Sequence, residues 1–158
     1  MTGRNRRVVM LVLAVMLVAV LSVMVNKRSN RNSPPSLKVT NGRDTITATQ
    51  GSCIWSNGHS SALIVDTGGP LEMYLNEELA GIMPDKDGYI TLRFSRLPDS
   101  YSVIVYTEDD VLKAEHAFGT LLHASGNQLS IPDDVTWIVS VQASWKQGEC
   151  YYCFYVKS

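Results

Sequence analysis

Residues 135–145 read VTWIVSVQASW, and this stretch decides the fold. Apolar side chains alternate along it with small or polar ones. One face carries Val135, Trp137, Val139, Val141, Ala143 and Trp145, and the other carries Thr136, Ser140, Gln142 and Ser144. A period of two residues is typical of a β-strand with one buried and one solvated face. We therefore predict a strand that buries both tryptophans and leaves Ser140 and Gln142 facing water.

The segments around this stretch predict more strands. Lys146–Glu149 has turn composition and Cys150–Val156 follows it, which predicts a closing hairpin. Further strands are expected at Thr45–Thr49 after the Asn41-Gly42 turn signal, at Tyr89–Phe94 and Tyr101–Tyr106 as a strand–turn–strand unit, and at Gln128–Ile131. Leu71–Ile82 fits a short helix, and Val111–Phe118 fits either type. Many short strands with Gly and Pro between them favour an all-β antiparallel sandwich over an α/β fold.

An apolar segment near the N-terminus predicts a membrane anchor. Val8–Val25 is interrupted only by Ser22 and contains no ionisable residue. At a helical rise of 1.5 Å per residue it spans about 27 Å, close to the thickness of the hydrocarbon core. Basic residues flank it on both sides, at Arg4, Arg6, Arg7, Lys27, Arg28 and Arg31. The alternative is a cleaved signal peptide with a weak cleavage site at Val20–Ser22.

The anchor divides the chain into four expected parts. These are a cytoplasmic basic segment at 1–7, a transmembrane helix at 8–25, a polar linker at 26–37 and an extracytoplasmic domain at 38–158. The last part carries eight basic and fifteen acidic residues, a formal net charge of −7. This composition offers no basic stripe for a phosphate backbone, so nucleic acid is not an expected partner. About 120 residues suit a single small domain.

Three stretches carry a family resemblance. They are Ile46–Trp55 with Gly51-Ser52, Pro84–Phe94 before Pro98, and Trp145 through Gly148 to Tyr152 and Phe154. In these stretches the chain resembles uncharacterised exported or membrane-anchored proteins of Gram-positive bacteria. The resemblance implies an immunoglobulin-like sandwich and a place at the cell membrane. Its motifs are turns and aromatic residues, and it implies no active site.

The segment Ala62–Gly69 resembles the active-site strand and loop of aspartic proteases, an apolar run that ends in Asp66-Thr67-Gly68. A domain of this size would supply one carboxylate and need a homodimer of the retroviral type to complete the pair. The second motif of such proteases contains a glycine, whereas the matching stretch, Ile138-Val139-Ser140, contains none. The favoured interpretation is therefore a strand that ends in a turn.

The cysteines predict a disulfide, and the polar residues predict no metal site. In an exported domain Cys53 is expected to bond Cys150 or Cys153, which point to opposite faces of one strand. The remaining thiol stays free. Asp85-Lys86-Asp87-Gly88 is interpreted as a solvated turn, because Met83 and Phe94 stand where a calcium loop needs acids. The histidines at 59, 116 and 123 lack zinc-site spacing, and Trp55, Trp137 and Trp145 are expected in the core.

These observations predict a non-catalytic binding or interaction module, tethered to the cell membrane by its N-terminal helix and facing outward. An envelope protein is the expected partner, and the sequence predicts no cofactor. The alternative is the homodimeric aspartic protease that uses Asp66. The oligomeric state stays open at this point.

Overall fold

The computed structural model describes residues 15–17, 33–56, 62–113, 119–132 and 135–157. The chain divides into two compact units, residues 1–33 and 34–158. In the first unit residues 15–17 are helical. The rest of the predicted anchor, the basic segment 1–7 and the linker up to residue 32 lie outside the described residues. No helix within the described ranges is long and apolar enough to cross a membrane.

The second unit contains a small antiparallel sheet with the strand order β2-β1-β6-β9. Its strands are β1 (Leu37–Thr40), β2 (Thr45–Thr47), β6 (Tyr89–Phe94) and β9 (Gln128–Ser130). β1 and β2 form a hairpin at the predicted Asn41-Gly42 turn, where the Asn41 side-chain oxygen accepts hydrogen bonds from the backbone of Arg43 and Asp44. Gly42 has a φ of +88°, which favours glycine at this position.

A larger sheet has the strand order β4-β3-β11-β10-β7-β8. Its strands are β3 (Thr49–Ser56), β4 (Ala62–Val65), β7 (Ser100–Thr107), β8 (Thr120–Leu122), β10 (Trp137–Trp145) and β11 (Gly148–Val156). Neighbours on this path are antiparallel, and the short β5 (Gly81–Ile82) pairs in parallel with the end of β11. The predicted hairpin is therefore confirmed as β10 and β11, at the centre of the sheet.

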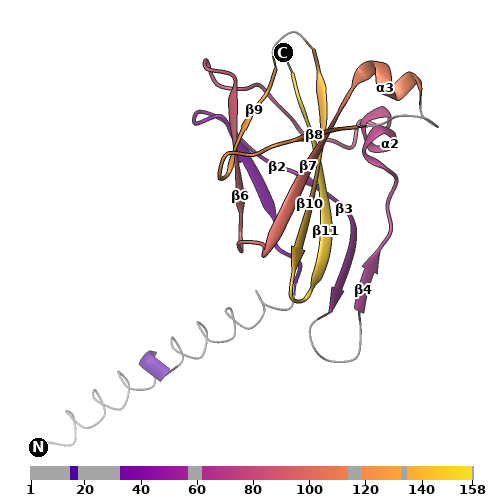
Figure 1. The fold of residues 1–158 in the computed structure, drawn as a ribbon. Coiled ribbons are helices and arrows are strands. Elements are labelled where there is room, and N and C mark those ends of the chain that lie inside the picture. The colour runs from indigo at the N-terminus through magenta and orange to yellow at the C-terminus, as the bar shows by residue number, and fades with distance from the viewer. Residues whose placement is uncertain (1–14, 18–32, 57–61, 114–118, 133–134, 158) are drawn as a thin grey trace, which may run out of the picture. The chain divides into compact units, whose positions relative to one another are not determined.

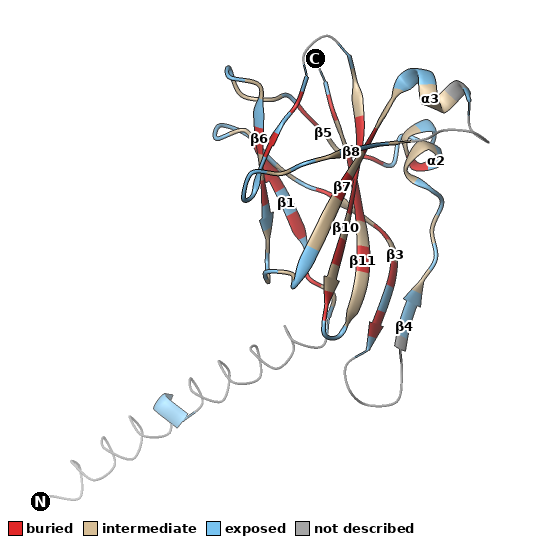
Figure 2. Cartoon of the chain, in the orientation of Figure 1, coloured by how far each residue is buried: buried red, intermediate tan, exposed pale blue. Residues whose placement is uncertain are grey.

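The two sheets pack against each other through one core (Figure 1). Val39 of β1 and Leu92 of β6 meet Val141 of β10 and Phe154 of β11 in a single cluster of buried residues. In Figure 2 buried residues, in red, recur along the strands of both sheets. The buried face predicted for this strand is thus confirmed for Val139, Val141, Ala143 and Trp145, and Trp137 is half-buried. Val135 is a correction, because it lies before β10 and is exposed.

The opposite face of the large sheet is partly covered, which corrects the prediction that Ser140 faces water. Met73 of α2 (Pro70–Leu75) packs with Leu79, Ile138 and Cys153 in a second buried cluster. Ser140 lies under this layer and is buried, and the Cys153 thiol is 4.0 Å from its hydroxyl oxygen. Alternation along one strand cannot reveal a second layer, since that layer comes from another part of the chain.

Two short helices lie between strands in the described part of this unit. Pro70 occupies the first turn of α2, where its missing N–H costs nothing. α3 (Glu108–Leu112) begins with a capping box in which the backbone N–H of Thr107 donates to Asp110 at 2.8 Å. These hydrogen bonds hold the pKa of Asp110 below its usual value. Of the predicted helix at Leu71–Ile82, only the first part is helical, and the end forms β5.

The strands predicted at 89–94 and 101–106 exist, but they are not paired with each other. β6 belongs to the small sheet and β7 to the large one. The connection between them crosses from one sheet to the other and is held by the Trp145 indole N–H, which donates to the carbonyls of Arg96 and Leu97 at 3.2 and 3.0 Å. A short connection that contains Pro and Ser is found both in hairpins and in crossovers between sheets. The local sequence therefore cannot distinguish these two connections.

Candidate functional site

The edge strand β4 forms one side of the large sheet. Among the described strands, β4 pairs with β3 alone, with Ile54 opposite Ile64 and Cys53 opposite Val65. Its other side therefore presents backbone N–H and C=O groups that no described strand pairs. Natural sheets usually protect such an edge with charge, proline or a bulge. β4 reads ALIV and contains none of the charged or proline residues that would do so.

Large aliphatic side chains surround this edge. Ile64 is 69% exposed, Ile54 53% and Leu63 49%. Ile54 and Ile64 lie side by side on the face that points away from the core, because their neighbours Cys53 and Trp55 are buried on the other face. We refer to the backbone of β4 together with Ile54, Leu63 and Ile64 as the β4 patch. An apolar cluster beside an unpaired edge is typical of a protein contact site.

Polar groups border the β4 patch. Glu149 of β11 is directly opposite Ile54, and its carboxylate accepts a hydrogen bond from Gln142 at 3.4 Å. Gly148, beside it, lies so close to β3 that a Cβ would be 1.9 Å from the Ile54 carbonyl oxygen. Glycine at this position therefore lets the β10–β11 hairpin pack against β3. β3, which carries Ile54, is therefore held in place by its pairing with β11 at the centre of the sheet.

The loop after β4 contains Asp66, the residue of the predicted protease alternative. Ala62–Val65 is a strand and residues 66–69 form the connection to α2, as the favoured interpretation expected. Asp66 is exposed, and the Ser52 hydroxyl donates to its carboxylate at 3.3 Å. The same hydroxyl accepts from the backbone N–H of Thr67 at 3.2 Å. Ser52 thus stabilises the loop.

The cysteine pairing is resolved in favour of Cys150. Cys53 and Cys150 form a disulfide between the neighbouring strands β3 and β11. Cys153 is free and buried on the opposite face, against the Ser140 hydroxyl. Burial raises the pKa of its thiol to about 11. This confirms a disulfide that leaves one thiol, and it makes Cys153 a packing residue rather than a nucleophile.

The tryptophans belong to the interior, not to a binding platform. Trp55 and Trp145 are buried with their ring centroids 5.6 Å apart, and Phe94 and Tyr152 pack on Trp145 at 6.0 and 6.4 Å. Trp137 is half-buried at the rim of the same cluster. The prediction that these rings stabilise the core is confirmed for Trp55 and Trp145.

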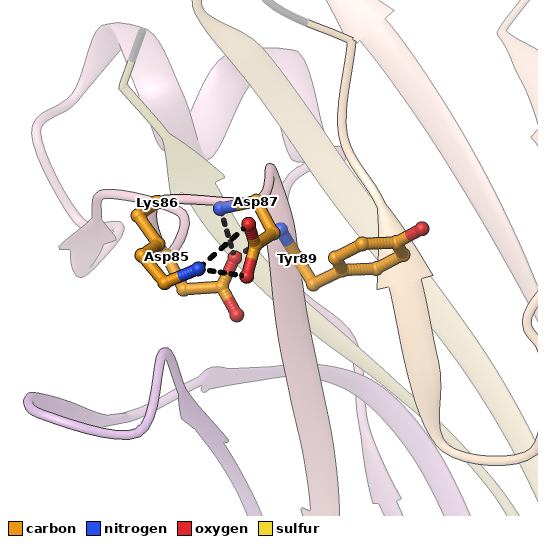
Figure 3. A network of polar contacts seen from close by, with 4 residues as sticks. All are labelled: Asp85, Lys86, Asp87 and Tyr89. Atoms are coloured by element: carbon orange, nitrogen blue, oxygen red, sulfur yellow. Dashed lines mark hydrogen bonds and ion pairs between the residues drawn. The ribbon is translucent and has the colours of Figure 1, made fainter.

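The Asp85–Gly88 segment is a turn stabilised by its own polar groups (Figure 3). The Asp85 carboxylate accepts backbone hydrogen bonds from Asp87 at 2.9 Å and Tyr89 at 2.8 Å, and Lys86 pairs with Asp87 at 2.7 Å. The described ranges contain no group of three or more metal-ligating side chains. His59 and His116 lie outside those ranges, and His123 is exposed.

Sequence reasoning missed the β4 patch, although a signal was present. Residues 62–65 are four consecutive apolar residues without alternation, a pattern typical of a strand buried on both faces. In the structure the same run lies at the edge of a sheet, and both of its faces are uncovered at Leu63 and Ile64.

Comparison of the chain with models of protein families, with curated proteins and with solved structures found no match.

Proposed function

We propose that this chain is a single-pass membrane protein whose outward-facing domain is a non-catalytic interaction module of the cell envelope. The apolar run Val8–Val25 supports the tether. The Cys53–Cys150 disulfide supports an oxidising compartment, because disulfides seldom persist in the cytosol. We assign the domain to the immunoglobulin-like sandwiches. This assignment agrees with the resemblance of the sequence to exported or membrane-anchored proteins of Gram-positive bacteria.

One feature supports the immunoglobulin-like assignment, and two depart from it. Two largely antiparallel sheets share a core. The buried Trp55 lies only two residues after Cys53 on the same strand, whereas the tryptophan of antibody domains is on a different strand from the first cysteine. In antibody domains the disulfide joins the two sheets. Here it joins neighbouring strands of one sheet. The proposed relationship therefore concerns the sandwich arrangement and not the disulfide framework.

The observation that carries the proposed function is the β4 patch. Ile54 and Ile64 expose more than half of their surface, whereas aliphatic residues at the centre of the same sheet, such as Ile138 and Val139, are fully buried. Because an unpaired strand edge can add a further strand by backbone hydrogen bonds, the contact we propose is made by strand addition. The aliphatic side chains would contribute by burial, at about 25 cal/mol per Å² of apolar surface.

Photo-crosslinking in living cells tests this function. A photoreactive amino acid replaces Ile64 in the full chain, and the matched control places it at Leu121 of the opposite edge strand, β8, which is 54% exposed. We expect a discrete covalent adduct in the membrane fraction for position 64 and none for position 121. The absence of any adduct at position 64, in cells that carry the protein at its natural level, would refute the proposed function.

A further inference from the structure

We propose that the occupant of the β4 patch is the β4 strand of a second copy of this chain. The two strands pair antiparallel with Ile64 opposite Ile64, so that the two large sheets join into one. This inference rests on the proposed function, because it takes the β4 patch to be the contact. It goes further by naming the partner and the register.

Backbone geometry supports a strand as the occupant. The unpaired side of β4 offers alternating donors and acceptors at the spacing that an antiparallel neighbour requires. β4 contains no proline and no charged side chain at Ala62–Val65, so two copies can approach without repulsion along the strand itself. A second β4 strand is therefore a partner with a matching set of backbone groups and no ionic penalty.

The positions of the isoleucines select the register. Directly opposed residues of antiparallel strands point to the same face. With Ile64 opposite Ile64, the row Ile54–Ile64 of one copy continues into Ile64–Ile54 of the other, four isoleucines in a line on the outer face. A shift by one residue would place Leu63 opposite Ile64 and turn the two outer faces to opposite sides. The proposed register is thus the one that makes the apolar row continuous across the two copies.

Charge is compatible with this register even though the domain is acidic. Asp66 lies two residues beyond Ile64, so it stands opposite Ala62 of the other copy and not opposite the second Asp66. At 3.4 Å per residue the two Asp66 residues are about 14 Å apart along the strands. This separation exceeds the Debye length of about 8 Å at physiological salt, so their repulsion is largely screened. The same distance prevents the shared proton of an aspartic protease pair.

Membrane confinement complements the small size of the contact. Two four-residue edges and the three exposed side chains on each copy bury less than the roughly 1,200 Å² typical of stable complexes. Pairing in dilute solution is therefore weak. Confinement of both copies to one membrane raises their effective concentration, and the experiment is accordingly made in membranes.

Cysteine crosslinking of the full chain in membranes tests partner and register together. Single variants Ile64→Cys, Asp66→Cys and Leu121→Cys are oxidised with copper phenanthroline and separated on non-reducing gels. The parent chain is the control for its own thiol, Cys153, which is buried. Directly opposed Cβ atoms are about 5 Å apart, so we expect on the order of tenfold more covalent dimer for Ile64→Cys than for the other two variants. Coexpression of Ala62→Cys with Asp66→Cys should crosslink where each alone does not.

Each other outcome overturns the inference in a recognisable way. If Asp66→Cys dimerises as well as Ile64→Cys, the register is wrong and the paired-carboxylate alternative is favoured. If no variant dimerises while the photoreactive group at residue 64 captures a different protein, the second copy is refuted and the proposed function stands. If neither method captures anything, both are refuted. As an independent confirmation, Ile64→Lys should abolish the crosslink between the coexpressed Ala62→Cys and Asp66→Cys chains, and Leu121→Lys should leave it unchanged.

Discussion

Replacement of Trp145 by alanine is the most direct test of how this domain is held together. Trp145 is 8% exposed, and its ring packs on Trp55, Phe94 and Tyr152. Truncation of a buried tryptophan to alanine costs about 3–5 kcal/mol through lost burial and the cavity that remains. The variant also loses the indole N–H bonds to the 95–99 connection, at a net cost of about 1 kcal/mol.

The total, about 4–6 kcal/mol, is a large share of the stability of a small domain, which is about 5–15 kcal/mol. With a urea m-value of about 2 kcal/mol per M, the midpoint of unfolding should fall by about 2–3 M. Residues 34–158 form a compact unit that contains the whole core and the disulfide, so the measurement uses this fragment. Circular dichroism reports unfolding, because Trp145 itself contributes to the fluorescence signal.

Two matched variants separate the causes. Trp145→Phe keeps an aromatic ring and loses the N–H, so it should cost less than half as much as Trp145→Ala. Ser144→Ala changes the adjacent, half-buried residue on the opposite face and should stay within about 0.5 kcal/mol of the parent. If Trp145→Ala unfolds at the same urea concentration as the parent, the reasoning is refuted and Trp145 does not belong to the core.

Three further predictions concern the disulfide, the free thiol and the N-terminus. Replacing both Cys53 and Cys150 by alanine should lower the free energy of unfolding by about 4–5 kcal/mol, since the bond closes a loop with a sequence separation of 97; an unchanged urea midpoint would contradict this. Cys153, whose thiol pKa is raised to about 11 by burial, should not react with Ellman's reagent at pH 8 in the native state and should yield one thiol per chain in urea without reductant. Intact-mass spectrometry of the membrane fraction should find Val8–Val25 retained, and a mature chain that begins at or after Val23 would show that the segment is a cleaved signal.

The sequence predicted local structure well and the environment of the strands less well. The alternation over residues 137–145 correctly placed Val139, Val141 and Trp145 in the core, because one strand's periodicity reflects which side is buried. It could not place Ser140, since the residues that cover it, Met73 and Leu79, come from a distant segment. The opposite-face argument for Cys150 and Cys153 was sound, but the choice between them depended on which face of β11 shares the core with Cys53.

The sequence by itself determined the predominance of antiparallel strands, the Asn41-Gly42 and Lys146–Glu149 turns and the existence of one disulfide, because these follow from periodicity, composition and residue chemistry. Only the tertiary structure decided that β6 and β7 lie in different sheets, that Cys150 is the bonded cysteine, and that β4 lies at an edge. The reason is physical. Strand order and the burial of a second face depend on contacts between segments far apart in the chain. An apolar run such as Ala62–Val65 reads the same whether a sheet continues beyond it or ends there.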